Sequence, residues 1–195
     1  MKKLVIALQS LFSRKKLSGE RIYLRPPKRR DALRWQKLRL YSKDFLVPWE
    51  PSWDSFSCSR RAYMRFLKNS NYLANMDRAY SFLIFNSTDK DLLGGVNVGN
   101  VRRGVAQSAN IGYWIGKKYS RKGYMHEALR VLIPSLFVDL RLNRVEATIL
   151  EENIASQKLL KKLGFKKEGK LRNYLKINGS WRDHVIYGLL QNDFK

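Results

Sequence analysis

Cysteine and histidine are scarce in this chain of 195 residues, which has one cysteine, Cys58, and two histidines. A single cysteine cannot form an intramolecular disulfide bond, so the sequence carries no sign of an oxidising compartment. No histidine-containing motif accompanies Cys58, and we interpret it as an inert small residue rather than a nucleophile. The sequence therefore excludes a disulfide-stapled fold and does not favour cysteine-based catalysis.

Long apolar runs are also lacking. The chain opens on a basic start and an apolar stretch, as a signal peptide does, but Ser13-Arg14-Lys15-Lys16 stands where a small-residue cleavage site belongs. The stretch is far shorter than the ~20 apolar residues that cross a bilayer. We expect a cytoplasmic protein with no stable membrane insertion. Residues 1–16 are interpreted as a basic lead-in segment with a short amphipathic helix, a membrane-surface anchor being the alternative.

Acidic residues are few: 16 Asp and Glu face 39 Lys and Arg, which gives a formal net charge of +23. A field of this sign favours anionic partners such as nucleic acid, a ribosomal surface or a phosphorylated cofactor. A solvated basic surface without a partner is the alternative. The charge thus indicates which partners are preferred, and it does not define a reaction.

The remaining pattern is that of one mixed α/β domain over residues 17–195, without linkers or internal repeats. Alternating or continuous apolar runs predict strands at residues 22–25, 81–85, 92–98, 110–115, 144–149 and 181–189. Capping residues and apolar periodicity predict helices after residue 31, at 60–69, after residue 123 and after residue 153. The helix after Asp31, its expected cap, should bury Leu33, Leu38 and Leu40. Residues 45–53 hold two prolines among bulky aromatics, which predicts a stiff, irregular loop.

A basic loop, residues 116–123, joins the strand at 110–115 to the following helix. Backbone N–H groups converge at such a helix start, where the helix dipole is positive, and this arrangement suits a pyrophosphate. Gly123 matters because a side chain there would keep phosphates away from the backbone. The loop matches neither Gly-x-Gly-x-x-Gly nor Gly-x-x-x-x-Gly-Lys-Ser/Thr. Alone, it is equally compatible with an ordinary strand-to-helix turn.

Three segments together resemble the cofactor core of the GNAT acetyltransferase superfamily: Ile111-Gly112-Tyr113-Trp114-Ile115-Gly116, Arg121 to Leu129, and Asn153 to Phe165. Within that superfamily, residues 172–184 and 19–26 are similar to the Rim-type ribosomal-protein-alanine N-acetyltransferases. The resemblance covers the chain from about Leu17 to its end. It implies an α/β fold of the GNAT type, with a mixed, mostly antiparallel twisted sheet, two splayed parallel strands and flanking helices.

The resemblance also implies acetyl-CoA as co-substrate and no metal. The strand end would pair with the pantetheine amides, the loop would wrap the pyrophosphate, and the last helix start would reach the pantetheine arm and the thioester. The residues implied are Trp114, Ile115, Gly116, Ser120, Arg121, Lys122, Gly123, Tyr124, Met125, Asn153 and Ser156.

Two positions depart from the family pattern. The loop begins with Ser120 and Arg121 where the family usually has Gln or Arg followed by Gly, and the added cation suits phosphate. Leu160 stands where many members have a tyrosine that protonates the departing thiolate. We interpret Ser156 as the substitute, because its hydroxyl can donate a hydrogen bond to the sulfur without full proton transfer.

The general base is open at this point. Glu146 is the first candidate, because it adjoins the cofactor strand on the face opposite Val145 and Ala147, although a surface carboxylate is an equal reading. Asp183 and His184 are the other candidates, unless they position the last strand or the acceptor, and a water relay is a third possibility.

An acceptor groove is predicted from aromatic and acidic residues. Trp49, Trp53 and Trp181 would line it, with Glu50 and Asp54 attracting a cationic amine, although core packing explains each tryptophan equally well.

The expected reaction is transfer of acetyl from acetyl-CoA to the N-terminal amine of a protein or peptide, a ribosomal protein being the leading candidate. The basic surface would contact RNA or the ribosome. One alternative is acetylation of a small amine such as an aminoglycoside or polyamine. The other is a non-catalytic ribosome- or RNA-binding protein that keeps the fold.

Overall fold

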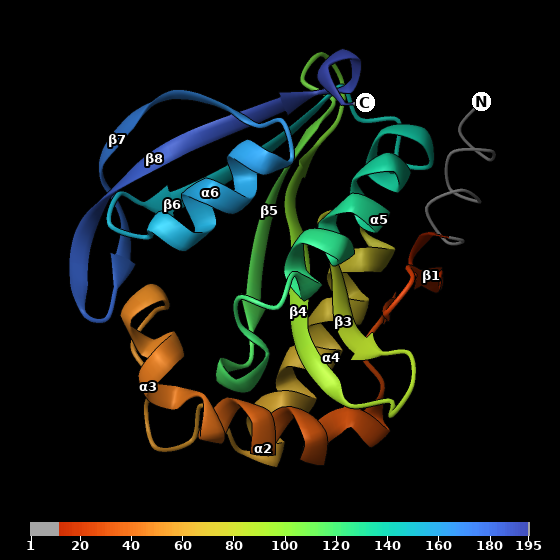
Figure 1. Ribbon diagram of the computed structural model, residues 1–195, viewed down its shortest axis with the longest axis vertical. Coiled ribbons are helices and arrows are strands. Elements are labelled where there is room, and N and C mark those ends of the chain that lie inside the picture. The colour runs from red at the N-terminus through yellow and green to blue at the C-terminus, as the bar shows by residue number, and fades with distance from the viewer. Residues whose placement is uncertain (1–11, 195) are drawn as a thin grey trace.

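A twisted sheet with helices on both faces forms the body of the molecule (Figure 1). The computed structural model describes residues 12–194. In this part of the chain, eight strands form one sheet in the order β1-β2-β3-β4-β5-β6-β8-β7. Every neighbouring pair is antiparallel except β5 and β6, which are parallel. The mixed, mostly antiparallel sheet predicted from the sequence is confirmed.

The elements follow one another with short connections. The strands are β1 (Leu17–Ser18), β2 (Ile22–Arg25), β3 (Tyr80–Asn86), β4 (Leu92–Arg102), β5 (Ser108–Ile115), β6 (Arg144–Leu150), β7 (Lys166–Ile177) and β8 (Ser180–Leu190). The α-helices are α2 (Ala32–Tyr41), α3 (Lys43–Leu46), α4 (Arg60–Asn75), α5 (Tyr124–Val138) and α6 (Ile154–Lys162). Short 3-10 turns are η1 (Arg29–Asp31), η2 (Val47–Trp49), η3 (Lys117–Tyr119) and η4 (Gln191–Asp193). No helix among residues 12–194 is long and apolar enough to span a bilayer.

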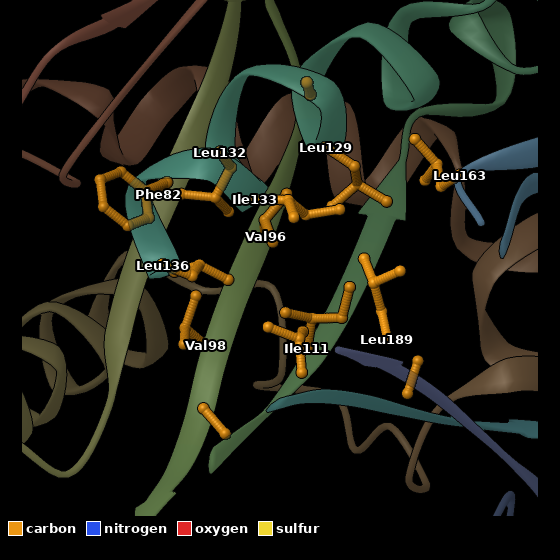
Figure 2. Packing of buried hydrophobic residues seen from close by; sticks show 14 of the residues in the cluster. Phe82, Val96, Val98, Ile111, Leu129, Leu132, Ile133, Leu136, Leu163 and Leu189 are labelled. Carbon is orange, nitrogen blue, oxygen red and sulfur yellow. The ribbon is translucent and has the colours of Figure 1, made fainter. Parts of the chain in front are cut away.

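Two apolar clusters hold the helices against opposite faces of the sheet. The larger joins α5 and α6 to the sheet, and Figure 2 shows Leu129, Leu132 and Leu136 of α5 lying over Val98 and its neighbours on the central strands. The smaller cluster joins α2 and α4 to the other face through residues that include Trp35, Leu38 and Tyr63. Because successive side chains of a strand point to opposite faces, the central strands serve both clusters.

The parallel pairing of β5 and β6 is short. It covers only Ser108↔Arg144, Ala109↔Val145 and Asn110↔Glu146. Beyond these residues β5 continues beside β4 as far as Ile115, and β6 continues beside β8 as far as Leu150. Figure 1 shows the two strands starting together and then separating. The predicted splay is therefore present, between two otherwise continuous halves of the sheet.

Strand β7 was not predicted from the sequence. Nine of its twelve residues are exposed, so the strand lacks the apolar alternation that reveals a half-buried strand. The strand pairs with β8 across a tight turn at Asn178 and Gly179, whose φ angles are 44° and 85°. Left-handed conformations at both central residues are what an Asn-Gly hairpin turn requires.

Local predictions around α2 were wrong in two respects. Asp31 does not cap the helix with its side chain; it is fully buried and accepts two 2.7 Å hydrogen bonds from the Arg25 guanidinium. Leu33 and Leu40 are 59% and 53% exposed, because the buried stripe passes through Leu38 and residues on its side of the helix instead.

The segment at residues 45–53 is more regular than predicted. Its first part completes α3 and forms the 3-10 turn η2, and Pro48 occupies a position early in that turn where its missing N–H costs nothing. The remainder, from Glu50 onward, has neither helical nor strand structure before α4.

The predicted lead-in segment is partly integrated into the fold. Residues 1–11, which carry most of its expected helix, lie outside the described residues. Phe12 is 1% exposed and packs edge-on against Tyr80 and Phe82, and Lys15 forms an ion pair with Asp139. The division into a lead-in over 1–16 and a domain over 17–195 stays a prediction.

The approach of β4 to β5 generates the first prediction. A Cβ atom on Gly94 would lie 2.3 Å from the Trp114 carbonyl oxygen, a backbone atom that cannot move aside. We expect Gly94→Ala to lower the free energy of unfolding by about 3 kcal/mol, the upper range of overpacking costs. Gly112→Ala on β5 is the matched control, because its Cβ would meet nothing within 4 Å, and we expect it to stay within about 0.5 kcal/mol. Urea denaturation of both variants measures this, and equal losses would refute the argument.

Candidate active site

The turn into α5 has the geometry of an anion site. Gly123 is the N-cap residue, with a φ of 83°, and it has no side chain with which to cap the helix. Arg121 before it is also left-handed, with a φ of 60°. Uncapped N–H groups at the positive end of a 15-residue helix favour a bound anion. The side chains of Arg121 and Lys122 are exposed beside this point, Ser120 and Tyr124 are half-buried, and Met125 is buried.

Arg21, from the turn before β2, braces this loop. Its Nε donates to Glu127 Oε2 at 2.9 Å, its backbone N–H donates to Glu127 Oε1 at 2.7 Å, and its Nη1 donates to the Lys122 carbonyl at 3.2 Å. Its guanidinium also lies 4.9 Å from the centre of the Tyr124 ring. Sequence reasoning missed Arg21, because about a hundred residues separate it from the loop that it supports.

A cavity opens beside the same loop. It measures about 620 Å³, and the residues lining it include Arg21, Gly123, His126, Arg130 and Lys162. Burial lowers the pKa of His126, and the neighbouring cations Lys162 and Arg130 lower it further. Glu20 and Glu127 also line the cavity, and Glu127 is paired with Arg21. A lining in which cations outnumber carboxylates, at a helix start, suits a phosphorylated ligand.

The start of α6 forms the other side of the splay. The Asn153 side chain caps the helix by accepting from the Ser156 N–H at 3.1 Å, which confirms the predicted cap. This bond engages the side-chain oxygen of Asn153. Ser156 is half-buried one turn into the helix. Contact of either residue with a cofactor stays a prediction.

The predicted cofactor residues at the end of β5 are well packed. Trp114 packs against the α2 and α4 cluster, and Ile115 against the α5 cluster on the opposite face. The Gly116 N–H donates to the Leu93 carbonyl at 2.8 Å, and the Gly116 carbonyl accepts from Tyr119 at 2.9 Å. Both backbone groups of Gly116 thus have protein partners. By contrast, a Cβ on Gly112, nearer the splay, would meet only open space.

Glu146 belongs to the last residue pair that joins β5 to β6 before the two strands separate, and it has two cationic partners. Its Oε2 accepts from Arg102 Nη2 at 2.7 Å, and its Oε1 accepts from Arg144 Nε at 2.8 Å. Arg144 also binds Glu168, so the carboxylate belongs to a charged network on β6 and β7. Each oxygen of Glu146 therefore already accepts a hydrogen bond from a guanidinium. Its role as a general base stays a prediction.

The predicted acceptor residues near α3 surround an arginine. Glu50 binds Arg39 through both carboxylate oxygens, and it accepts from Trp53 Nε1 at 2.9 Å. The Arg39 guanidinium lies 4.3 Å from the Trp53 ring centre and 5.1 Å from that of Trp114. The negative charge of Glu50 is consequently balanced by Arg39 within the protein, which the sequence did not indicate. Trp49 is 37% exposed at the edge of this group.

The β7–β8 hairpin carries the other predicted acceptor residues. The Asp183 carboxylate accepts from the Asn173 N–H at 2.9 Å and pairs with Lys170, and these contacts hold its pKa below the usual range. His184 is 3% exposed, and its Nδ1 lies 3.0 Å from the Arg182 carbonyl oxygen. Since a carbonyl only accepts, Nδ1 carries the hydrogen of this bond.

The hairpin and the α3 region meet. The Asn178 N–H at the hairpin turn donates to the Glu50 carbonyl at 2.9 Å. The structure therefore brings the segment that carries Trp49, Glu50 and Trp53 into contact with the turn of the hairpin. Trp181, which is 61% exposed, extends from the start of β8.

Comparison with known proteins agrees with this geometry. The family model described as acetyltransferase (GNAT) domain matches residues 21–166. The [ribosomal protein uS5]-alanine N-acetyltransferase of Escherichia coli is 35% identical over 179 residues, which are 92% of this chain and 92% of that protein.

Solved structures are similar as well. RimJ of Mycobacterium smegmatis, in complex with CoA-disulfide, has a TM-score of 0.87 and 31% identity over 91% of this chain and 88% of its own. The ribosomal-protein-S5-alanine acetyltransferase of Vibrio fischeri has a TM-score of 0.85 and 28% identity over 93% and 99%. The chain belongs to the GNAT acetyltransferase family. Within it, this protein is an N-acetyltransferase similar to the ribosomal-protein-alanine enzymes.

The environment of Glu50 predicts that its charge is structural. Glu50→Gln keeps an acceptor for Trp53 but leaves Arg39 without its counter-ion, and the side chain of Arg39 is only 12% exposed. We expect the free energy of unfolding to fall by about 2–3 kcal/mol, since removing one partner leaves a largely buried charge unpaired. Glu151→Gln, which removes the exposed ion pair with Lys170, is the control and should leave stability nearly unchanged. Chemical denaturation compares them; an unchanged stability in Glu50→Gln would show that its carboxylate is available to a ligand.

Proposed function

We propose that this enzyme transfers the acetyl group of acetyl-CoA to the N-terminal amine of a protein, with a ribosomal protein as first candidate. The observation that carries the proposal is the splay between β5 and β6, with the uncapped start of α5 at one end and the start of α6 beside it. Phosphates would bind at Gly123, and the pantetheine arm would lie in the splay, where Gly112 leaves open space.

The acceptor class follows from proton chemistry and from the relatives. An α-amino group has a pKa near ~8, against ~10.4 for lysine, so a larger fraction of it is neutral and nucleophilic at pH 7. A terminal amine therefore asks less of a base. The Escherichia coli relative is named for alanine of ribosomal protein uS5, which favours a protein acceptor here. The exposed Trp49 and Trp181 offer aromatic surface to an extended peptide.

Two groups are proposed as alternatives for the base. Glu146 is close to the splay, but both of its oxygens are engaged by arginines. His184 lies on the same face of the neighbouring strand, at the position paired with Leu150, and because its Nδ1 donates to the Arg182 carbonyl, Nε2 is the ring nitrogen that would take the proton. A backbone N–H of β5 near Ile115 would hold the oxyanion, as proposed for acyl transfer in general.

The small-amine alternative is less favoured. Aminoglycosides and polyamines are polycations, and a protein with a charge of +23 repels them unless the acceptor pocket is locally acidic. The carboxylates of Glu50 and Asp183, on the acceptor side, are each paired with a cation. A ribosomal partner, with its anionic RNA, matches the same excess of positive charge.

The decisive experiment is an acetylation assay. The protein is incubated with acetyl-CoA and peptides that have free or blocked amino termini, including one that begins with alanine, and the release of free thiol is followed. We expect release only with free amino termini. Release from blocked, lysine-containing peptides alone would refute the N-terminal assignment. Absence of both turnover and a rise in Tm with acetyl-CoA would refute acetyl-CoA as the co-substrate.

The phosphate site generates a separate prediction. Gly123→Ala adds a Cβ that faces Arg21 Nη2 at 3.2 Å, at the point where an anion would approach the helix. We expect the Kd for CoA to rise at least about tenfold, equivalent to 1.4 kcal/mol. Gly104→Ala is the matched control: its φ of 65° imposes a similar backbone strain of about 1–2 kcal/mol, but a Cβ there contacts nothing within 4 Å. Calorimetric titration with CoA compares the two, and equal affinities would exclude this loop as the phosphate site.

A further inference from the structure

Tyr113 has a hydroxyl that is buried without a full hydrogen bond to the described part of the chain. It lies on β5, three residues beyond the end of the parallel pairing, and its ring packs against the cluster under α5 and α6. Its Oη is closed off from solvent and has no hydrogen-bond partner among residues 12–194. A buried polar atom left unpaired costs roughly 1–3 kcal/mol, and most such atoms in native structures have a partner. A bound ligand could therefore supply the hydrogen-bond partner that residues 12–194 do not provide.

The surroundings of this hydroxyl identify the place as the splay. Burial raises the pKa of Tyr113, and the nearby Ser156 side chain, at the start of α6, lowers it as a weak hydrogen-bond partner would, although the two hydroxyls do not reach full hydrogen-bond geometry. Tyr187 is the other phenol of this group, and its Oη donates to Gln157 Oε1 at 3.1 Å. Of the two phenols, that of Tyr113 lacks a hydrogen-bond partner within the described part of the chain.

We propose that Tyr113 is a catalytic residue whose hydroxyl donates a hydrogen bond to the sulfur of the leaving CoA, from β5 rather than from α6. This inference rests on the proposed function. Leu160, the helical position where many family members have a tyrosine, is fully buried in the core and has no polar group. Tyr113 on β5 and Ser156 on α6 have side chains close to each other, so the two hydroxyls would share the sulfur.

The chemistry needs a donor and not a full proton transfer. In acetyl transfer, a bond forms between the amine nitrogen and the acetyl carbon, the carbon–sulfur bond breaks, and its electron pair leaves on sulfur. The amine gives up one proton to the base, and the thiolate takes one from water to become a thiol. Burial raises the pKa of Tyr113 to about 12, so the phenol keeps its proton while the sulfur is charged. A thiol pKa near ~8.5 makes the thiolate the stable acceptor of that hydrogen bond.

The test compares Tyr113→Phe with Tyr187→Phe, a matched loss of a phenol that already has a protein partner. Each variant is saturated with CoA, and the pKa of the bound thiol is read from the ultraviolet absorbance of the thiolate. We expect that pKa to rise by about one to two pH units in Tyr113→Phe and to stay unchanged in Tyr187→Phe. With an acceptor peptide, kcat should fall about tenfold to a hundredfold in Tyr113→Phe alone, while the Kd for CoA below the thiol pKa changes less than about threefold.

Stability without ligand gives an independent result. Because Tyr113→Phe removes an unpaired hydroxyl, its Tm should equal or exceed that of the parent protein, whereas Tyr187→Phe should melt lower because Gln157 loses its donor. A bound-thiol pKa that is the same in the parent protein and Tyr113→Phe would overturn the inference and leave the proposed function standing. A parent protein that does not bind CoA would overturn both. A fall in Tm of Tyr113→Phe that parallels its loss of kcat would assign the hydroxyl to structure and also overturn the inference.

Discussion

The site depends on the short contact between the only two parallel neighbours in the described sheet. Three residue pairs join β5 to β6, and each strand then follows a different antiparallel partner. A central strand that loses its neighbour exposes backbone groups inside the molecule, which is costly unless something pairs with them. In the described sheet this loss of pairing occurs between β5 and β6, near the starts of α5 and α6. The opening between these two strands forms the proposed acetyl-CoA site.

Charge is distributed unevenly around this opening. The carboxylates of Asp31, Glu50, Glu127, Glu146 and Asp183 all form ion pairs with arginine or lysine. Because acidic residues are so few, pairing consumes many of them, and the excess of positive charge remains for the surface. The chain thus uses its acidic residues mainly to fix its own structure, and attraction of an amine must come from shape, aromatic surface and a small number of bases.

Sequence patterns identified the elements that carry apolar periodicity or caps. The strands from Tyr80 to Ile115, the loop at Gly123 and the Asn153 cap are of this kind, because local chemistry determines them. Strand β7 was not predicted because its residues are mostly exposed. The sequence nevertheless contains a hairpin signal, Asn178-Gly179, at the end of this strand. The helix α2 was assigned the wrong stripe, since Leu33 is apolar but exposed.

Parts of the site could not be read from the sequence at all. The contacts of Arg21 with Glu127 and of Arg39 with Glu50 join segments whose spacing has no local meaning. That the Tyr113 hydroxyl lacks a hydrogen-bond partner among the described residues can be seen only from the three-dimensional positions of the side chains around it. Long-range pairing and unmet pairing are both properties of the assembled core. Sequence reasoning therefore located the elements of the proposed cofactor site but not the side chains that support them.

The two halves of the site also differ in how the chain builds them. One continuous stretch, from β5 to the end of α6, supplies the splay and both helix starts. The proposed acceptor side instead joins two distant segments, the Glu50 region and the Asn178 turn, through a backbone hydrogen bond. Changes at the tip of the β7–β8 hairpin, beyond the residues of β8 that pair with β6, can therefore accumulate with little effect on the stretch that would hold the acetyl donor. Such an architecture lets descendants of one ancestral enzyme acquire new acceptors while inheriting the donor site intact.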